Sequence, residues 1–299
     1  MRLVDSHAHL QADAFGLDRA AVIAAAHEAG VERILVPGWD SGSSAAAVAL
    51  AREHGLDAAV GVHPHDAALV NEAGWAAIVK LAADPRVVAI GETGLDFDRM
   101  HSPQEAQLAN LRRHLRLALA VGKPAILHCR SAAGRRDAQD ALIAELRLAG
   151  FGGAAGHDVF GDRPPAVLHS FSGPVDYAAA ALEMGIAIAF GGLVFRRGEE
   201  DSAQVVQVVP AGRLLVETDS PYLAPPGVPR QKPGAAPTVP APPGLAADPT
   251  AVFAGRRNSP EWVRITALWV AERRGESPDS IGKGLVQAYD ATFQRESMA

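Results

Sequence analysis

The stretch ERILVPGWDSGSSAAAVALAREHGLDAAVGV, residues 32–62, holds one complete unit of the pattern that decides the fold. The aliphatic run Glu32–Pro37 predicts a buried strand, the alanine-rich run Ser44–His54 predicts a helix, and Ala58–Val62 predicts the next strand. Strands that alternate with helices indicate βα units whose strands are parallel. The stretch therefore predicts a parallel sheet covered by helices.

The same unit recurs along the whole chain. The predicted strands are Arg2–Ser6, Glu32–Pro37, Ala58–Val62, Val87–Gly91, Pro124–His128, Ala166–His169, Ala187–Phe190 and Leu214–Thr218. The predicted helices are Arg19–Glu28, Ser44–His54, Ala73–Ala82, Pro103–Val121, Arg136–Leu148, Val175–Met184, Ala203–Val209, Pro260–Arg274 and Pro278–Glu296. These units most simply close into an α/β protein of the (β/α)8 TIM-barrel class, although an open doubly wound sheet gives nearly the same pattern.

We expect residues 1–299 to form a single domain, because a chain of this length with 48% apolar residues can bury one large core. Two segments interrupt the repeat. Phe151–Pro165 is rich in glycine and proline, and Ala224–Pro249 contains nine prolines and three glycines. We interpret both as loop insertions on the surface, and a lid over the functional rim is the alternative for a long loop.

Charge and cysteine content exclude several classes of protein. The net charge is −6, which argues against a generally basic nucleic-acid coat protein. No stretch has the length of a membrane helix and the first residues do not form a signal peptide, so we expect a soluble cytoplasmic protein. The single cysteine, Cys129, excludes an intrachain disulfide and a thiolate metal cluster. Any bound metal must use histidine, carboxylate and water.

Polar side chains stand where the predicted strands end. They are His7, His9, His63, Glu92, His128, His169 and Asp219. A barrel brings the carboxyl ends of its strands together in one rim, where active sites form. His7 and His9 are two residues apart in an extended segment, so their imidazoles face the same side and can bind one ion. The sequence therefore predicts a metal site at this rim.

The charges of the ligands indicate the kind of substrate. Four neutral imidazoles with Glu92 and Asp219 bring a charge of about −2, so two divalent ions would leave the pocket positive by about two charges. This surplus favours an anionic substrate such as a phosphodiester. Nitrogen and oxygen donors together fit zinc, manganese or iron and permit magnesium.

Two further side chains at the rim are candidate substrate contacts. His63 precedes a proline, so it contacts a substrate phosphate, supports the metal site from behind a ligand, or forms hydrogen bonds within the turn. Arg130 follows the fifth strand and can bind a phosphate through two parallel hydrogen bonds. The alternative for Arg130 is a salt bridge at the rim with Asp96 or Glu199.

Arg257 and Asn258 are weaker candidates for substrate binding. Both stand immediately before Ser259-Pro260, where a helix is predicted to begin. Asn258 could equally cap that helix, as could Ser259.

At these residues the chain resembles the TatD family of metal-dependent hydrolases, which are amidohydrolase-type barrels. The resemblance runs in order through Asp5-Ser6-His7-Ala8-His9-Leu10, Gly61-Val62-His63-Pro64-His65, Gly91-Glu92-Thr93-Gly94-Leu95-Asp96-Phe97, Leu127-His128-Cys129-Arg130, His169-Ser170-Phe171-Ser172-Gly173, Glu217-Thr218-Asp219-Ser220-Pro221-Tyr222-Leu223 and Arg257-Asn258. The blocks cover most of the chain. The main departures are the two insertions.

The resemblance implies a hydrolase that uses two divalent metal ions, Mg, Mn or Zn, and commonly acts as a 3′-to-5′ exonuclease on DNA. Carried over residue by residue, it implies that His7, His9 and Asp219 hold one ion, that His128 and His169 hold the other, and that Glu92 bridges both. Tyr222 lines the pocket by the same resemblance. DNA, as single strands or 3′ ends, is the implied partner, with no membrane and no obligate protein partner.

The catalytic roles then fall to two carboxylates. Asp219 is expected to orient the attacking water and accept its proton, while Glu92 holds the ions. Because only 5% of residues are aromatic, we expect the protein to hold few terminal nucleotides instead of a long stacked strand.

Three alternatives stay open. A binuclear amidohydrolase that acts on a small amide, lactone or nucleobase uses a similar barrel, but no lysine follows a predicted strand where it could be carbamylated. A deacylase of aminoacyl-tRNA is a second alternative, because some related proteins have that activity. The third is a metal-holding or adaptor protein without turnover.

Overall fold

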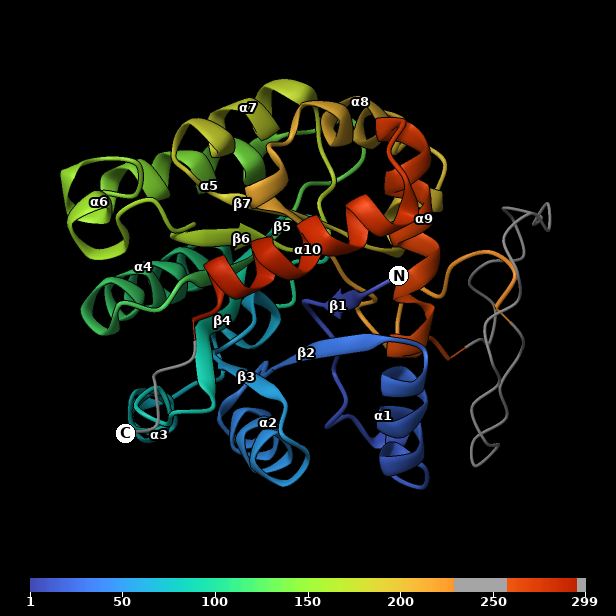
Figure 1. Ribbon diagram of the computed structural model, residues 1–299. Helices are drawn as coiled ribbons and strands as arrows, with labels where there is room; N and C mark the ends of the chain where they lie inside the picture. Colours follow the sequence, from blue (N-terminus) through green and yellow to red (C-terminus); the bar gives the residue numbers. More distant parts are fainter. Residues whose placement is uncertain (229–256, 295–299) are drawn as a thin grey trace.

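The structure is a computed structural model that describes residues 1–228 and 257–294. Eight parallel strands form one sheet in sequence order, with helices around it (Figure 1). The strands are β1 (Leu3–Asp5), β2 (Val31–Pro37), β3 (Asp57–Val60), β4 (Val87–Asp96), β5 (Ala125–Arg130), β6 (Ala166–Leu168), β7 (Ala187–Phe190) and β8 (Leu214–Val216). The (β/α)8 barrel is thereby confirmed. The strand order excludes the doubly wound sheet, in which sequential strands would not all be neighbours.

Backbone hydrogen bonds beyond the ends of β1 and β8 close the barrel. The amide of Ser6 donates to the carbonyl of Val216 (3.1 Å), and the amide of His9 donates to Ser220 (2.7 Å). The amide of Asp219 donates to the carbonyl of His7 (2.8 Å), although Asp219 has a φ of +54°, which is uncommon for a residue other than glycine. Closure therefore sets Asp219 beside the paired histidines of the first strand.

The core follows from the composition of the strands. Every residue of β1, β3, β4, β6, β7 and β8 is buried, because a barrel strand is covered by side chains inside and by helices outside. The side chains inside the barrel and those that face the helices therefore come from the same runs of valine, isoleucine, leucine and alanine. The barrel interior is packed and is not a pore.

Strand β4 is longer than the sequence predicts. It continues beyond Gly91 to Asp96, so Glu92 lies within the strand and not after it. A register shift occurs between Ile90 and Thr93, and Gly94 then pairs with His128 of β5. A Cβ at Gly94 would collide with the carbonyl oxygen of His128, and its φ of +142° also favours glycine. This close approach brings the ends of β4 and β5 together.

The helices are α1 (Arg19–Glu28), α2 (Ser41–His54), α3 (Glu72–Leu81), α4 (Gln104–Val121), α5 (Asp137–Leu148), α6 (Ala154–Phe160), α7 (Val175–Glu183), α8 (Asp201–Val208), α9 (Val263–Arg274) and α10 (Pro278–Thr292). Most match their predicted ranges within a few residues. Helix α2 begins three residues early because the Asp40 side chain accepts a hydrogen bond from the amide of Ser43 in a capping box.

The predicted insertion near residues 151–165 contains helix α6, which the glycine-rich composition did not predict. Phe151 and Phe160 are buried, with ring centroids 6.3 Å apart, and α6 packs near α4. This segment is therefore anchored to the barrel. Of the second predicted insertion, residues 224–228 are described and the rest lies outside the described residues.

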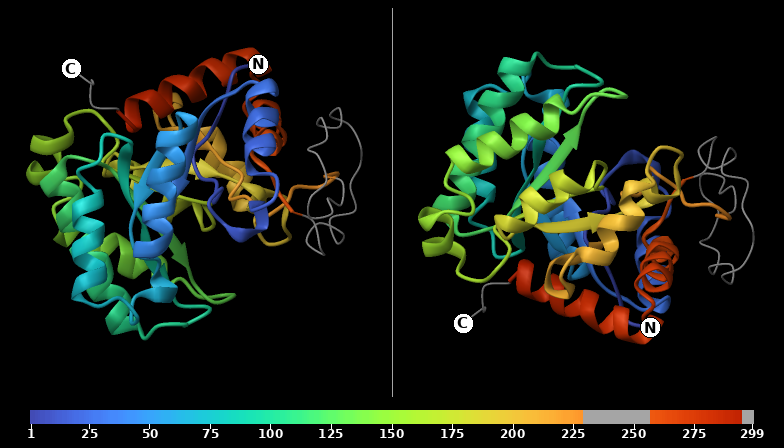
Figure 2. Two further views of the ribbon diagram at one scale, coloured as in Figure 1. Left: turned by 90° about the horizontal axis from the view of Figure 1, so that it is seen from below. Right: turned by 90° about the horizontal axis from the view of Figure 1, so that it is seen from above.

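Helix α10 covers the end of the barrel where the strands begin. Gly282 lies against Arg2, directly before β1, and the Tyr289 hydroxyl donates to Asp57 at the start of β3 (2.9 Å). Both figures place the N-terminus beside this helix (Figures 1 and 2). The opposite end carries the polar rim. No helix among the described residues has the length and apolar character needed to cross a membrane.

Candidate metal centre

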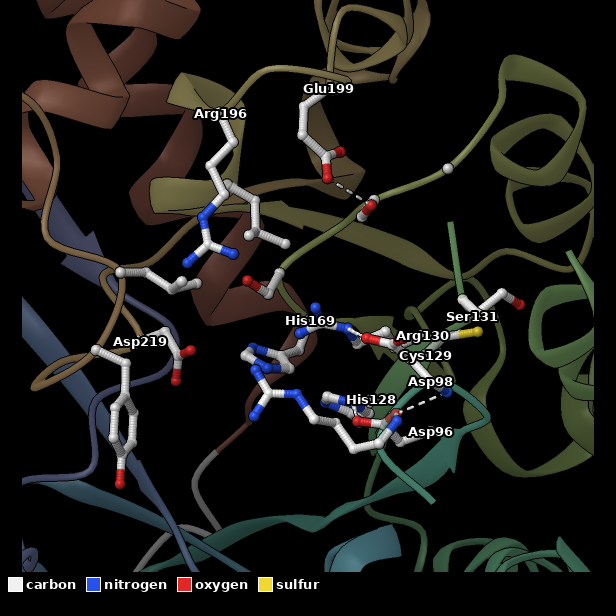
Figure 3. A pocket seen from close by; sticks show the side chains of 18 of the residues that line it. Asp96, Asp98, His128, Cys129, Arg130, Ser131, His169, Arg196, Glu199 and Asp219 are labelled. Atoms are coloured by element: carbon white, nitrogen blue, oxygen red, sulfur yellow. Dashed lines mark hydrogen bonds and ion pairs between the residues drawn. The ribbon is translucent and has the colours of Figure 1, made fainter. Parts of the chain in front are cut away.

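Polar side chains at the carboxyl ends of the strands line one cavity of about 1210 Å³. They include His9, Glu92, His128, His169 and Asp219, which come from five different strands or the segments that follow them. Figure 3 shows His128, His169 and Asp219 facing the same space. The structure thus brings together residues more than 200 positions apart.

One cluster of donor atoms forms where the first and last strands meet. The Nε2 atoms of His7 and His9 lie 3.2 Å apart. Glu92 Oε2 lies 3.3 Å from His7 Nε2 and 3.6 Å from His9 Nε2. Asp219 Oδ1 lies 3.8 Å from His7 Nε2 and 3.4 Å from His9 Nε2. Donors about 2.1 Å from a tetrahedral ion lie about 3.4 Å from each other, so this spacing fits one metal ion.

A second cluster surrounds the other oxygen of Glu92. Glu92 Oε1 lies 3.2 Å from His128 Nδ1, 3.4 Å from His169 Nε2 and 3.3 Å from His63 Nε2. The carboxylate therefore faces one group of imidazoles with each oxygen. His63, for which the sequence predicts a substrate contact, a supporting role at the metal site or a turn hydrogen bond, stands within reach of this cluster.

The outward nitrogens of three histidines determine which nitrogen faces the cavity. His9 Nδ1 donates to the carbonyl of Pro37 (3.2 Å), His128 Nε2 donates to Asp96 Oδ2 (3.2 Å), and His169 Nδ1 donates to Glu217 Oε1 (2.8 Å). In its neutral form, each of these rings turns an unprotonated nitrogen inward, as a metal ligand requires.

His63 has the opposite arrangement. Its Nδ1 accepts a hydrogen bond from the amide of His65 (3.1 Å), so the neutral ring carries its proton on Nε2, toward Glu92. Burial lowers the pKa of His63 to about 4 despite the nearby Glu92 carboxylate, which keeps the ring neutral at pH 7. This tautomer suits a hydrogen-bond donor better than a metal ligand.

The buried carboxylates of the site attract positive charge. Burial alone would raise the pKa of Glu92, but His63, His169 and His7 outweigh it and hold the pKa well below its ordinary value. Burial also opposes the charge of His169, yet Glu217 and Glu92 raise the pKa of that imidazole to about 10. Carboxylates that charge a buried histidine would stabilise a divalent cation more strongly. The donor set therefore fits a metal.

The rim residues divide into two groups. Arg130 and Tyr222 line the cavity. The sequence suggested Asp96 or Glu199 as a salt-bridge partner of Arg130. In the structure the partner is Asp98, which accepts a hydrogen bond from Arg130 Nε (2.8 Å). The side chain of Tyr222 is 57% exposed, and its ring centroid lies 5.9 Å from that of His9.

Arg257 and Asn258 do not line this cavity in the structure. Arg257 donates to both carboxylate oxygens of Asp18 (2.8 and 2.7 Å), next to α1. Asn258 is buried and donates to the carbonyl of Thr218 (2.8 Å), while its own amide oxygen accepts from Ser259. The bond from Asn258 holds the backbone next to Asp219. Both side chains therefore have structural partners that account for their positions.

Several residues of the site were not predicted. Asp96 binds His65 and His128, Glu217 binds His169, and Trp39 lies beside His9 with ring centroids 5.5 Å apart. Glu92 and Asp96 share one face of β4 at even spacing, which could have indicated Asp96. No sequence signal distinguishes Trp39 from an ordinary loop residue.

Known proteins resemble this chain over nearly its full length. The profile of the family described as TatD related DNase matches residues 4–294. A 3′-5′ ssDNA/RNA exonuclease TatD of Cronobacter sakazakii is 36% identical over 92% of each chain. An uncharacterized metal-dependent hydrolase, YabD, of Bacillus subtilis is 32% identical over 90% of each chain. The crystal structure of the TatD homologue YJJV of Escherichia coli covers 98% of each chain at 26% identity, with a TM-score of 0.78. The chain therefore belongs to the TatD-related DNase family of metal-dependent hydrolases.

Proposed function

We propose that this protein is a 3′-to-5′ exonuclease that hydrolyses phosphodiesters of single-stranded DNA with two divalent ions, Mg, Mn or Zn. The observation that carries the proposal is the position of Glu92, whose two oxygens each face a separate group of imidazoles. The name of the Cronobacter relative supports the substrate and the polarity. In this proposal His7, His9 and Asp219 would hold one ion, His128 and His169 would hold the other, and Glu92 would be a ligand of both.

Bound ions of this kind polarise phosphate oxygens and lower the pKa of water. The chain supplies the remaining functions. Asp219 orients the attacking water and accepts its proton, because its carboxylate is anchored beside His9 and faces the cavity. Burial alone would raise the pKa of Asp219, but His9 and the neighbouring imidazoles hold it below its ordinary value, so the carboxylate is ionised.

The rim supplies contacts to the substrate. His63 carries its Nε2 proton beside Glu92, where it would donate to that carboxylate or to a phosphate oxygen bound next to it. Arg130 binds phosphate through the guanidinium edge that Asp98 does not use. Tyr222 offers an exposed ring to a base near the scissile bond. No lysine is among the described side chains that line the cavity, which argues against an amidohydrolase with a carbamylated lysine.

Substitution of the two carboxylates tests this function. We expect Glu92→Gln and Asp219→Asn each to lower the hydrolysis rate by at least about a hundredfold, because each removes an ionised group from the reacting centre. The substrate is an oligodeoxynucleotide labelled at either end, supplied with Mg, Mn or Zn, with metal content measured in parallel. A 3′ label should be released in the first product.

Asp290→Asn is the matched control, because it neutralises a carboxylate of α10 at the other end of the barrel. Rates equal to wild type in both site variants at full metal occupancy would reject the assignment. Turnover of lactones or cyclic amides without turnover of DNA would favour the small-molecule alternative.

A further inference from the structure

A second arginine approaches the metal centre from the far side of the cavity. Arg196 ends the short 3-10 helix Gly192–Phe195 that follows β7, and its amide donates to the carbonyl of Leu193 (2.8 Å). The half-buried side chain lines the cavity and points down toward His169 (Figure 3). The loop geometry therefore directs a cation into the space beside the proposed ligands.

Other guanidinium groups converge on the same space from different loops. Burial lowers the pKa of Arg196, the positive charges of Arg130 and Arg99 lower it further, and the carboxylates of Glu199 and Asp219 oppose this decrease. Arg130 comes from β5 and Arg99 from the loop after β4. Cations gathered in a partly buried cavity repel one another, and an anion bound between them removes that cost.

Two carboxylates near these arginines accept hydrogen bonds, and Glu199 also attracts both Arg196 and Arg130. Glu199 Oε1 accepts a hydrogen bond from the Ser172 hydroxyl (2.8 Å), and Asp98 Oδ2 accepts from Arg130 Nε (2.8 Å). The dashed lines of Figure 3 mark both contacts. The Asp98 bond fixes the direction of the Arg130 side chain and leaves its terminal amino groups outside that bond. Arg196 and Arg130 thus both line the cavity, and the charge of Arg130 acts on Arg196.

We propose that Arg196, together with Arg130, forms a subsite for the phosphate adjacent to the scissile one in a polynucleotide. The proposal rests on the function proposed above, in which the histidines and carboxylates serve the scissile phosphate. A nucleic-acid strand carries one phosphate per nucleotide, so a second phosphate accompanies every bound end longer than one linkage. The planar guanidinium matches a phosphate through parallel hydrogen bonds.

Two substrates separate this subsite from the reacting centre. The p-nitrophenyl ester of thymidine 5′-monophosphate has one phosphodiester and no neighbouring phosphate, whereas oligothymidylate has both. We expect Arg196→Met to raise the KM for oligothymidylate roughly tenfold, the loss typical of one charge-assisted hydrogen bond. Its kcat for both substrates and its KM for the nitrophenyl ester should stay within about twofold of wild type.

The matched control is Arg116→Met, since Arg116 is exposed on α4 and does not line the cavity. It should leave both KM values unchanged. Arg196→Lys keeps the positive charge but loses the planar guanidinium, so it should give an intermediate KM. This variant also tests the subsite if Arg196→Met does not fold. The slope of log binding constant against log salt should fall by about one in Arg196→Met.

A chemically altered substrate identifies the phosphate. A methylphosphonate in place of the phosphate next to the scissile bond should raise the KM of wild type and have little effect on Arg196→Met. An equal methylphosphonate effect in both proteins would overturn the proposal. So would an unchanged KM in Arg196→Met, or an equal loss on the nitrophenyl ester.

Binding measured by fluorescence anisotropy distinguishes the two proposals. If wild type hydrolyses neither substrate, the proposed function fails, and the subsite is judged by affinity alone. A roughly tenfold weaker Kd of Arg196→Met for oligothymidylate would then still support the subsite, and an equal Kd would refute it.

Discussion

Three inward-facing imidazoles of the candidate metal centre, those of His9, His128 and His169, are held by a hydrogen-bond partner at the other nitrogen. Asp96 performs this task for His128 and also accepts from His65 Nε2 (2.8 Å). Asp96 is buried at the end of β4, and its other oxygen accepts from the backbone amide of Arg99 (2.8 Å). The hydrogen bonds to His128 and His65 outweigh burial and hold the pKa of Asp96 below its ordinary value. The carboxylate therefore fixes the His128 ring without itself touching the cluster around Glu92.

We expect Asp96→Asn to weaken metal binding by about tenfold to a hundredfold, because removal of a partner behind a ligand histidine has effects of this size. The measurement is metal retention against a competing chelator. Asp98→Asn is the control, since it removes a neighbouring rim carboxylate that pairs with Arg130. Equal retention by wild type and Asp96→Asn would show that His128 needs no such support.

Site residues could be predicted from sequence where a strand end determines their direction. His7, His9, His128 and His169 follow this rule, and their donor atoms do converge. Arg257 does not, because its direction depends on Asp18, a residue 239 positions away. The tautomer of His63 also depends on a turn whose geometry the sequence does not specify.

Helix α4 is joined to the loop after β3 through the buried ring of His114. The His114 Nδ1 donates to the carbonyl of Asn110 (2.7 Å), and its Nε2 accepts from the amide of Val62 (2.9 Å). Both nitrogens are therefore satisfied only in the neutral ring. Burial lowers the pKa of His114 to about 3, against an ordinary value of 6.5. A proton on Nε2 would face the Val62 amide and break this bond.

The stability of wild type should accordingly fall in acid. Between pH 6.5 and 3 the unfolded chain binds a proton at His114 that the folded protein does not bind. This contribution is complete above pH 6.5 and is lost as the pH decreases, by up to about 1.4 kcal/mol per pH unit. Urea unfolding at several pH values should show a weaker dependence in His114→Gln. The exposed His27→Gln is the control, and identical slopes in His114→Gln and wild type would contradict the assignment.

The helices and strands with strong local patterns could be predicted, and those defined by tertiary contacts could not. Helix α1 matches its predicted range because its alanine-rich periodicity is local. The end of β4 depends on pairing between Gly94 and His128, which no local pattern encodes. Helix α6 depends on the burial of Phe160 against distant parts of the chain.

At the level of the complete barrel, the alternation of strands and helices predicted the parallel sheet but not its closure. A doubly wound sheet has the same alternation, and the distinction comes from contacts such as Ser6 with Val216, 210 residues apart. The two ends of the barrel therefore have different roles. The carboxyl end collects the histidines and carboxylates, and the amino end is covered by α10.

Because these roles are separate, a substitution at the amino end of the barrel should alter stability without altering the candidate metal centre. Tyr289→Phe removes a donor from the buried carboxylate of Asp57 and should lower the free energy of unfolding by about 1 to 3 kcal/mol. Urea unfolding followed by circular dichroism measures this loss. Metal content and hydrolysis rate per folded molecule should remain those of wild type. A reduced rate at full folding would show that the two ends are coupled.

The cover of α10 and the packed barrel interior also restrict how a polymer can move. The part of the barrel that the structure describes has no tunnel, so in the proposed exonuclease a strand enters and leaves by the same opening, and each released nucleotide departs through that opening as well. Residues 1–228 and 257–294 form no ring or clamp that would keep hold of the shortened strand. Digestion should therefore be distributive, with many strands trimmed a little in place of a few consumed processively.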